Sequence, residues 1–212
     1  ATVTPTIAVV GPSTPQPSSP AKIGAGVFTR SFMEHFPLIP VEEEGRLQDP
    51  VLREMFVERV FTLRRFRDSF RKGMSRGGLV RFHTDHKLLL LSHGRTRYTE
   101  MGNLVARAKD LPVEEAYDRY QKLLMDALSQ RATPAKCADV LTHMLGHLRT
   151  FLSHEEKMEL LDVIDRYRNR LIPLVVPATL FRHFIRKYGI AYLERQVFLN
   201  PHPVELMLRN HV

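Results

Sequence analysis

The chain contains 212 residues, with one cysteine, no tryptophan and a formal net charge of +8. The single cysteine, Cys137, excludes an internal disulfide framework and any zinc or iron–sulfur site built from several thiolates of this chain. No run of the sequence approaches the roughly 20 apolar residues of a membrane span, and its start lacks the basic-then-apolar order of a signal peptide, so we expect a cytoplasmic protein without a membrane partner.

The first 48 residues have a mixed character that differs from the rest of the chain. The β-branched stretch TIAVV at 6–10 predicts a short strand that needs a partner. Residues 11–24, GPSTPQPSSPAKIG, predict a loop because proline interrupts both helices and strands. A short amphipathic helix is expected from Val27 to the residue before Pro37, followed by an extended piece and a turn. We interpret 1–48 as the C-terminal end of a larger domain.

Long helical periods joined by short breaks run from position 49 almost to the end of the sequence. Asp49 and Thr133 each precede a proline, and Ser153 with Glu156 matches a capping box, so these positions predict helix starts. The expected helices cover 51–70, 75–94, 96–110, 113–130, 135–152, 156–171 and 176–189, with two short ones in 190–212. The predicted fold class is therefore mainly α, a multi-helical bundle of about seven to nine helices behind a short mixed α/β segment. The expected divisions are 1–48, a connecting basic helix at 49–74 and a helical domain at 75–212.

The stretch RFHTDHKLLLLSHG at 81–94 sets polar side chains around four consecutive leucines. His83 and Lys87 are one helical turn apart, so together with Arg81 they are candidates for contact with an anion. Two alternatives stay open. His83 and His86 could bind a metal, or they could be hydrogen-bonded between helices while the leucines fill the core.

A second histidine stripe lies in DVLTHMLGH at 139–147, where Asp139, His143 and His147 follow at i, i+4 and i+8. This spacing suits either a metal site, and with it a metal-dependent enzyme, or a solvated face. The sequence has no HExxH, no GxSxG and no glycine-rich phosphate-binding turn. Cys137 lies on the apolar stripe of the same helix and is expected to be a buried thiol, so the residues give no support for nucleophilic catalysis.

Two clusters of basic residues form the candidate nucleic-acid-binding site. Arginine dominates the first cluster, which favours bidentate contacts with phosphate over a simply solvated face. The second, FRHFIRKYG at 181–189, places cations beside aromatic side chains, a combination that suits RNA unless the aromatic residues belong to the core. The predicted contact residues are Arg64, Arg67, Arg71, Lys72, Arg76, Arg81, His83 and Lys87, together with Arg182, His183, Arg186 and Lys187.

Three separated segments resemble the YbgA-type helical domain: VRFHTDHKLLLLSH at 80–93, IPLVVPATLFRHFIRKY at 172–188 and LNPHPVELMLRNHV at 199–212. The likeness covers 75–212. The preceding FTRSFMEHFPLIPVEEEGRLQDPVLREMFVERVF at 28–61 is similar to the end of the thiouracil desulfidase domain that is often fused in front of such domains. The sequence departs from the family pattern at Cys137 and Asp139, where a histidine and an asparagine are expected. The combination resembles the bacterial tRNA 4-thiouridine desulfidases.

The resemblance implies a two-part enzyme. An N-terminal domain would hold a 4Fe-4S cluster on three cysteines and remove sulfur from thiouridine, while the helical domain would bind tRNA. The cluster-binding cysteines would precede residue 1, so we expect no cofactor on this chain and no catalysis by this chain alone. The expected function is thus the tRNA-binding C-terminal part of a desulfidase-like protein, with tRNA and the desulfidase catalytic domain, in cis or in trans, as partners. The alternative is a protein-docking or regulatory module for that domain.

Overall fold

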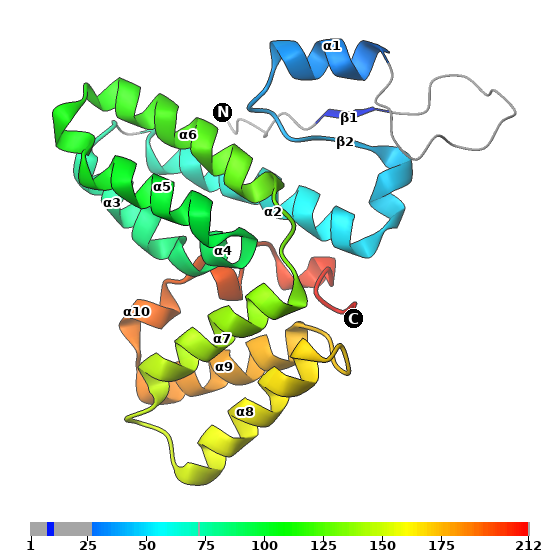
Figure 1. Ribbon diagram of the computed structural model, residues 1–212, viewed down its shortest axis with the longest axis vertical. Coiled ribbons are helices and arrows are strands. Elements are labelled where there is room, and N and C mark those ends of the chain that lie inside the picture. The colour runs from blue at the N-terminus through cyan, green and yellow to red at the C-terminus, as the bar shows by residue number, and fades with distance from the viewer. Residues whose placement is uncertain (1–7, 11–26, 72, 212) are drawn as a thin grey trace, which may run out of the picture.

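The computed structural model describes residues 8–10, 27–71 and 73–211, and most of this part of the chain is helical (Figure 1). The predicted mainly-α fold is confirmed. The α-helices are α1 (Val27–His35), α2 (Pro50–Ser69), α3 (Arg76–Asp85), α4 (Lys87–His93), α5 (Arg95–Ala106), α6 (Val113–Ser129), α7 (Pro134–Leu148), α8 (His154–Arg168), α9 (Val175–Tyr188) and α10 (Ala191–Glu194). Short 3-10 helices are η1 (Glu44–Gln48), η2 (Ala108–Asp110), η3 (Val197–Leu199) and η4 (Val204–Leu206). Lys72 and the loop expected at 11–24 lie outside the described residues. None of the described helices is both long and apolar enough to cross a membrane.

The N-terminal segment forms a small β-α-β unit. Strand β1 (Ala8–Val10) pairs in parallel with β2 (Val41–Glu43), in a register that sets Ala8 opposite Val41, and α1 belongs to the connection between the strands. The expected strand and helix are therefore confirmed, and the partner strand comes from the extended piece after α1. Two strands of three residues each are too few to be stable by themselves, so this unit depends on what packs against it.

Helix starts follow the capping residues that the sequence contains. Asp49, Thr133 and Ser153 each accept a hydrogen bond from a backbone N–H in the first turn of α2, α7 and α8. Glu156 completes a capping box by accepting from the backbone N–H of Ser153. All three predicted starts are confirmed to within two residues, because capping is a local interaction.

The structure has two helices where the sequence predicts one. The expected helix over 75–94 breaks at His86, whose φ of −98° and ψ of 1° leave helical geometry between α3 and α4. The break allows α4 to turn into the interior, where Leu88, Leu89 and Leu90 have no exposed surface. Three consecutive residues point to different sides of a helix, so their complete burial means that α4 is enclosed on most of its circumference, with the half-buried Lys87 and Leu91 on the remaining side.

The helices form two groups around α4 (Figure 1). Helices α2, α3, α5 and α6 lie on one side, α7, α8 and α9 on the other, and α4 packs against α5, α6, α7 and η3. Most of the buried apolar side chains form one continuous cluster that extends from Phe66 on α2 to Leu199 on η3. The core thus joins both groups, and no boundary separates them within the described part of the chain.

Candidate functional site

The first basic cluster lies along the end of α2 and on α3. Arg67 and Arg81 are exposed. Arg64 forms an ion pair with Asp68 one turn later, and Arg71 lies 3.8 Å from the same carboxylate. One acid against four arginines leaves the cluster positively charged, as the sequence predicts.

Arg76 has partners that the sequence does not reveal. Its Nε donates to the carbonyl of Ala108 at 2.9 Å and its Nη2 to the carbonyl of Leu111 at 2.8 Å. The guanidinium therefore joins the start of α3 to the loop after α5. A nucleic-acid contact by Arg76 stays a prediction, and Lys72 cannot be placed because it is outside the described residues.

His83 lies in the core, not on an anion-facing surface. Only 8% of the residue is exposed, its Nδ1 is 3.1 Å from the Tyr120 hydroxyl, and its ring stacks on Tyr98 with centroids 5.2 Å apart. Burial, with Lys87 nearby, lowers the pKa of His83 to about 4, so the ring is neutral at pH 7. The structure corrects the expectation of an anion contact by His83 and agrees with the alternative of a histidine hydrogen-bonded between helices. Lys87, at the start of α4, is half-buried.

The second basic cluster lies on α9. His183 and Arg186 are exposed, whereas Lys187 donates to a carboxylate oxygen of Glu156 on α8 at 2.6 Å. Lys187 is therefore partly neutralised, and Arg186 keeps a charge that faces solvent.

The aromatic residues beside these cations do not face solvent. Phe181 and Phe184 are 0% and 4% exposed and belong to the core, and the hydroxyl of the half-buried Tyr188 donates to Glu156. These residues stabilise the packing of α9, so the expected stacking of bases on them has no support in this arrangement.

The two clusters meet at Asn200. Arg65 on α2 donates from Nη2 to the Asn200 backbone carbonyl at 3.1 Å, and Arg182 on α9 donates from Nη1 to the Asn200 side-chain oxygen at 2.8 Å. Asn200 is exposed, and Arg182 is also anchored by Thr179. Segments 135 residues apart in the sequence thus bring the two clusters together. We call the resulting set the basic surface: Arg64, Arg65, Arg67, Arg71, Arg81, Arg182, Arg186 and Arg195.

An open cleft of about 690 Å³ lies within the basic surface and is lined by Arg65, Arg81 and Arg195. Asp85 also lines it and lies 3.3 Å from Arg195. Two buried polar atoms beside the cleft, Nη1 of Arg65 and Nε2 of His86, have no hydrogen-bond partner among the described residues. The cleft is a place where an anion with several acceptor oxygens can meet more than one guanidinium group.

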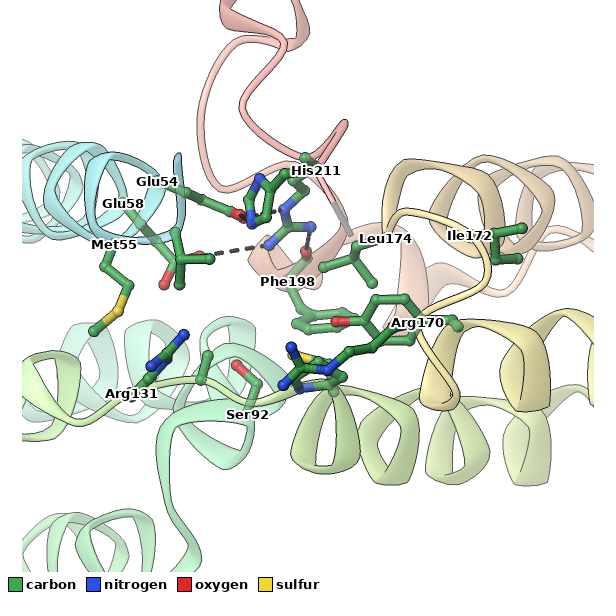
Figure 2. A pocket seen from close by; sticks show the side chains of 16 residues that line it. Glu54, Met55, Glu58, Ser92, Arg131, Arg170, Ile172, Leu174, Phe198 and His211 are labelled. Carbon is green, nitrogen blue, oxygen red and sulfur yellow. Dashed lines mark hydrogen bonds and ion pairs between the residues drawn. The ribbon is translucent and has the colours of Figure 1, made fainter. Parts of the chain in front are cut away.

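A second feature is a buried charge cluster, defined by Glu54 and Glu58 on α2, His93 on α4 and Arg209 near the C-terminus. Figure 2 shows the two glutamates of this cluster. Arg209 Nε donates to Glu54 at 2.9 Å, and its Nη2 lies 3.4 Å from Glu58. A third bond, from Nη1 to the Phe198 carbonyl at 2.6 Å, fixes the guanidinium in place. Each buried charge therefore has an opposite partner, which is the condition for placing charges inside a protein.

Glu58 and His93 form a buried hydrogen-bonded pair inside this cluster. Nε2 of His93 is 2.5 Å from Oε1 of Glu58, and Nδ1 is 2.6 Å from the Gln130 carbonyl oxygen. Burial by itself would raise the pKa of Glu58, but the ring of His93 and the charge of Arg209 outweigh it, so the pKa is lowered. Because both ring nitrogens face oxygen atoms, one hydrogen must lie between His93 and Glu58 to complete the pair.

Cys137 does not fit an iron–sulfur cluster. It is the single cysteine of the chain, it is 5% exposed, and burial raises the pKa of its thiol to about 12. A cluster needs several thiolates at one place. The residues of this chain therefore cannot hold the implied 4Fe-4S group, and the prediction that Cys137 is a buried thiol is confirmed.

The histidine stripe on α7 is exposed, and its acid is paired with another helix. Asp139 accepts a hydrogen bond from Arg168 on α8 at 2.9 Å, and the rings of His143 and His147 are 5.1 Å apart. Across residues 8–10, 27–71 and 73–211, no three acidic, histidine or cysteine side chains are grouped as metal ligands would be. The structure gives no support to the metal-dependent alternative.

The sequence does not predict several residues of these sites. Arg195 and Asn200 lie outside both basic runs, and Arg209 is isolated in the sequence from the acids that it binds. One signal was available: Glu54 and Glu58 stand one helical turn apart on a helix whose other face is apolar, which is typical of two carboxylates directed to the same place.

Comparisons with known proteins give a relative and a family for this chain. The chain is 29% identical over 153 residues to the "Uncharacterized protein YbgA" of Escherichia coli (strain K12), an alignment that covers 72% of this chain and 90% of that protein. No solved structure matches the chain. The model of one family, described as "Protein of unknown function (DUF1722)", matches residues 87–203, from the start of α4 to the loop before η4. Since this match spans more than half of the sequence, the chain belongs to the DUF1722 family.

Proposed function

We propose that this chain is an RNA-binding module whose ligand is tRNA and whose contact area is the basic surface. The observation that carries the proposal is the junction at Asn200, because it joins the arginines of α2 and α9 into one continuous area. Without that junction the same residues would be two separate solvated faces.

The chemistry of the surface favours phosphate as the group that is bound. All eight members of the basic surface are arginines, and the planar guanidinium fork matches two phosphate oxygens at once. The formal charge of +8 adds a long-range attraction to a polyanion. Binding of this kind releases counterions, so the affinity should fall steeply as salt is added.

The choice of tRNA, and of a desulfidase as the enzymatic context, rests on the family resemblance. The β1-α1-β2 unit supports it, since a pair of short parallel strands joined through a helix is the repeating piece of larger α/β domains. In this proposal residues 1–48 complete a desulfidase-like domain, and the 4Fe-4S cluster belongs to that domain, in cis or in trans. The helical domain then holds the tRNA while sulfur is removed elsewhere.

The test is the salt dependence of tRNA binding by a double variant, Arg67→Gln with Arg186→Gln. These two arginines are exposed and lie in different clusters, so the change should weaken binding at least tenfold and reduce the slope of log Kd against log salt by about 0.7 to 0.9 for each phosphate contact that is lost. Fluorescence anisotropy with labelled tRNA at several salt concentrations measures both quantities.

The matched control is Arg119→Gln with Arg166→Gln. It removes the same charge from α6 and α8, where each guanidinium pairs with an acid of its own helix. Equal losses in both double variants would show that net charge alone drives the binding, and they would overturn the assignment of the basic surface.

The docking alternative has support from α1 and the residue that follows it. Val27 and Met33 on α1, and Phe36 directly after it, expose 90%, 46% and 49% of their surfaces, which is unusual for three apolar residues in one short segment. Binding of the isolated desulfidase domain to this chain, together with no measurable affinity for tRNA, would favour docking over RNA binding.

A further inference from the structure

A small pocket lies beside the buried charge cluster, where residues from α2, α4, the loop before α7, the end of α8 and the C-terminal segment come together. Its volume is about 80 Å³, room for several water molecules or for one small ion. In the view of Figure 2, Glu54, Glu58 and His211 lie on one side of the pocket, and Arg131, Ser92 and Arg170 on the other.

The charges on the acidic side are already balanced. Glu54 pairs with Arg209 and lies 3.4 Å from His211, and Glu58 pairs with His93 and Arg209. These carboxylates are therefore not free to attract a cation into the pocket.

The charges on the other side are not balanced. Arg131 and Arg170 both line the pocket and are exposed residues, and among the residues that the structure describes neither guanidinium forms an ion pair with a carboxylate. Two guanidinium groups that no carboxylate neutralises, beside one cavity of this size, favour a small anion.

Arg170 also has a backbone conformation that a glycine would adopt more easily. Its φ is +58°, in the left-handed region, just after α8. The N–H of Leu171 bonds to the carbonyl of Arg166, and the N–H of Arg170 to that of Tyr167, which is the Schellman pattern at the end of a helix. Glycine is the usual residue at this position, so an arginine here has a conformational cost. The arginine places a guanidinium beside the pocket, which a glycine could not do.

Ser92 adds a hydrogen-bond acceptor to the same side of the pocket. Its hydroxyl donates to the Leu89 carbonyl at 2.7 Å, which leaves the oxygen free to accept a hydrogen bond. A ligand that offers both anionic oxygens and a hydroxyl hydrogen would satisfy the two arginines and the serine together. Monohydrogen phosphate has this combination, whereas sulfate at neutral pH carries no hydrogen.

We propose that this pocket binds a phosphate group that keeps one hydrogen, with Arg131 and Arg170 donating to its oxygens and Ser92 accepting from its hydroxyl. A phosphate monoester binds in this way as its monoanion, because the second pKa of such a group is about 6. The phosphate group has two possible sources. It belongs either to a small compound, such as inorganic phosphate or a small phosphate monoester, or to the terminus of an RNA strand. The site is separate from the basic surface and goes beyond the proposed function.

The experiment is isothermal titration calorimetry of the full chain with inorganic phosphate, using Arg170→Gly, Arg131→Gln and the control Arg166→Gln. Each pocket variant should raise the Kd for phosphate at least tenfold, while the control, whose side chain pairs with Asp162, keeps the wild-type value. Arg170→Gly should fold at least as stably as the wild type because glycine suits the positive φ. A loss of binding in that variant therefore cannot come from unfolding.

Additional ligands distinguish the sources of the phosphate. If 5′-phosphorylated RNA binds the wild type more tightly than 5′-hydroxyl RNA, and Arg170→Gly removes the difference, the RNA terminus is the ligand. If glycerol 3-phosphate binds and the two RNAs are equal, the ligand is a small phosphate compound. Absence of phosphate binding by the wild type, equal binding in all variants, or equal binding of sulfate would overturn the proposal. None of these results bears on the basic surface, which the Arg67 and Arg186 variants test separately.

Discussion

Glu58 shows how much a single buried acid contributes in this protein. It is 5% exposed and contacts both His93 and Arg209, so its removal leaves two buried donors without their partner. The effect of a change at Glu58 is therefore set mainly by the groups that stay behind.

We expect Glu58→Gln to lower the free energy of unfolding by about 3 kcal/mol, because it breaks a buried ion pair from one side. The matched control is Glu115→Gln, which removes an exposed partner of Arg119 and should cost less than about 1 kcal/mol. Urea unfolding followed by circular dichroism measures both. A loss at Glu58 no larger than that at Glu115 would mean that the buried charge cluster does not stabilise the fold.

The break between α3 and α4 has a consequence at the scale of the element. His83 and His86 both lie at the end of α3, and burial lowers the pKa of each to about 4. Lys87 adds to the effect on His83. At His86, a bond to the Phe82 carbonyl opposes the shift, while Arg65 and His83 add to it. The two rings are thus neutral in the folded protein under conditions in which exposed rings would begin to be protonated.

This difference predicts acid sensitivity between pH 6.5 and 4. In that window the unfolded chain binds more protons than the folded one, so the free energy of unfolding falls as the pH is lowered, by up to about 3 kcal/mol for each of the two histidines. His86→Phe should remove roughly half of that dependence, although it also loses the bond to Phe82. Unfolding in urea at pH 7.5, 6.5, 5.5 and 4.5 tests the slope. An unchanged slope in both His83→Phe and His86→Phe would contradict the prediction.

At the scale of the whole molecule, one core holds both groups of helices. The apolar cluster runs without interruption from α2 to η3, and α4 is enclosed within it. A change in α4 should therefore weaken both groups together.

Leu89→Ala is the corresponding prediction. Leu89 has no exposed surface, so the cavity should lower the free energy of unfolding by about 2 to 5 kcal/mol. We expect one cooperative transition, with hydrogen exchange in α6 and α8 accelerating to the same extent. Leu161→Ala, at a residue that is 37% exposed on α8, provides a milder control. Separate melting of α7 to α9 would show that the two groups are independent domains.

Local interactions explain which parts of this architecture the sequence predicts. Asp49, Thr133 and Ser153 bond within a few residues of themselves, so the starts of α2, α7 and α8 are visible in the sequence. The break at His86 is not visible, because it depends on the space that distant helices leave for the leucines of α4.

The site residues divide in the same way. The arginine content of the two clusters is evident from the sequence, but their junction at Asn200 requires contacts over 135 and 18 residues. In the sequence His83 resembles an available cation, whereas in the structure Tyr98 and Tyr120 contact its ring. Polar residues thus reveal which chemistry is present, while tertiary packing decides which of them remain available for it.

The contact between Glu58 and Arg209 spans 151 residues, which matters while the chain is being synthesised. At about 5 to 20 residues per second, the ribosome adds Arg209 roughly 8 to 30 seconds after Glu58. During that interval Glu58 can pair with His93 but not with the guanidinium of Arg209. The packing of α2 is therefore incomplete. A nascent chain halted between these two residues would keep a charged, half-closed interior, the kind of surface that chaperones and proteases recognise.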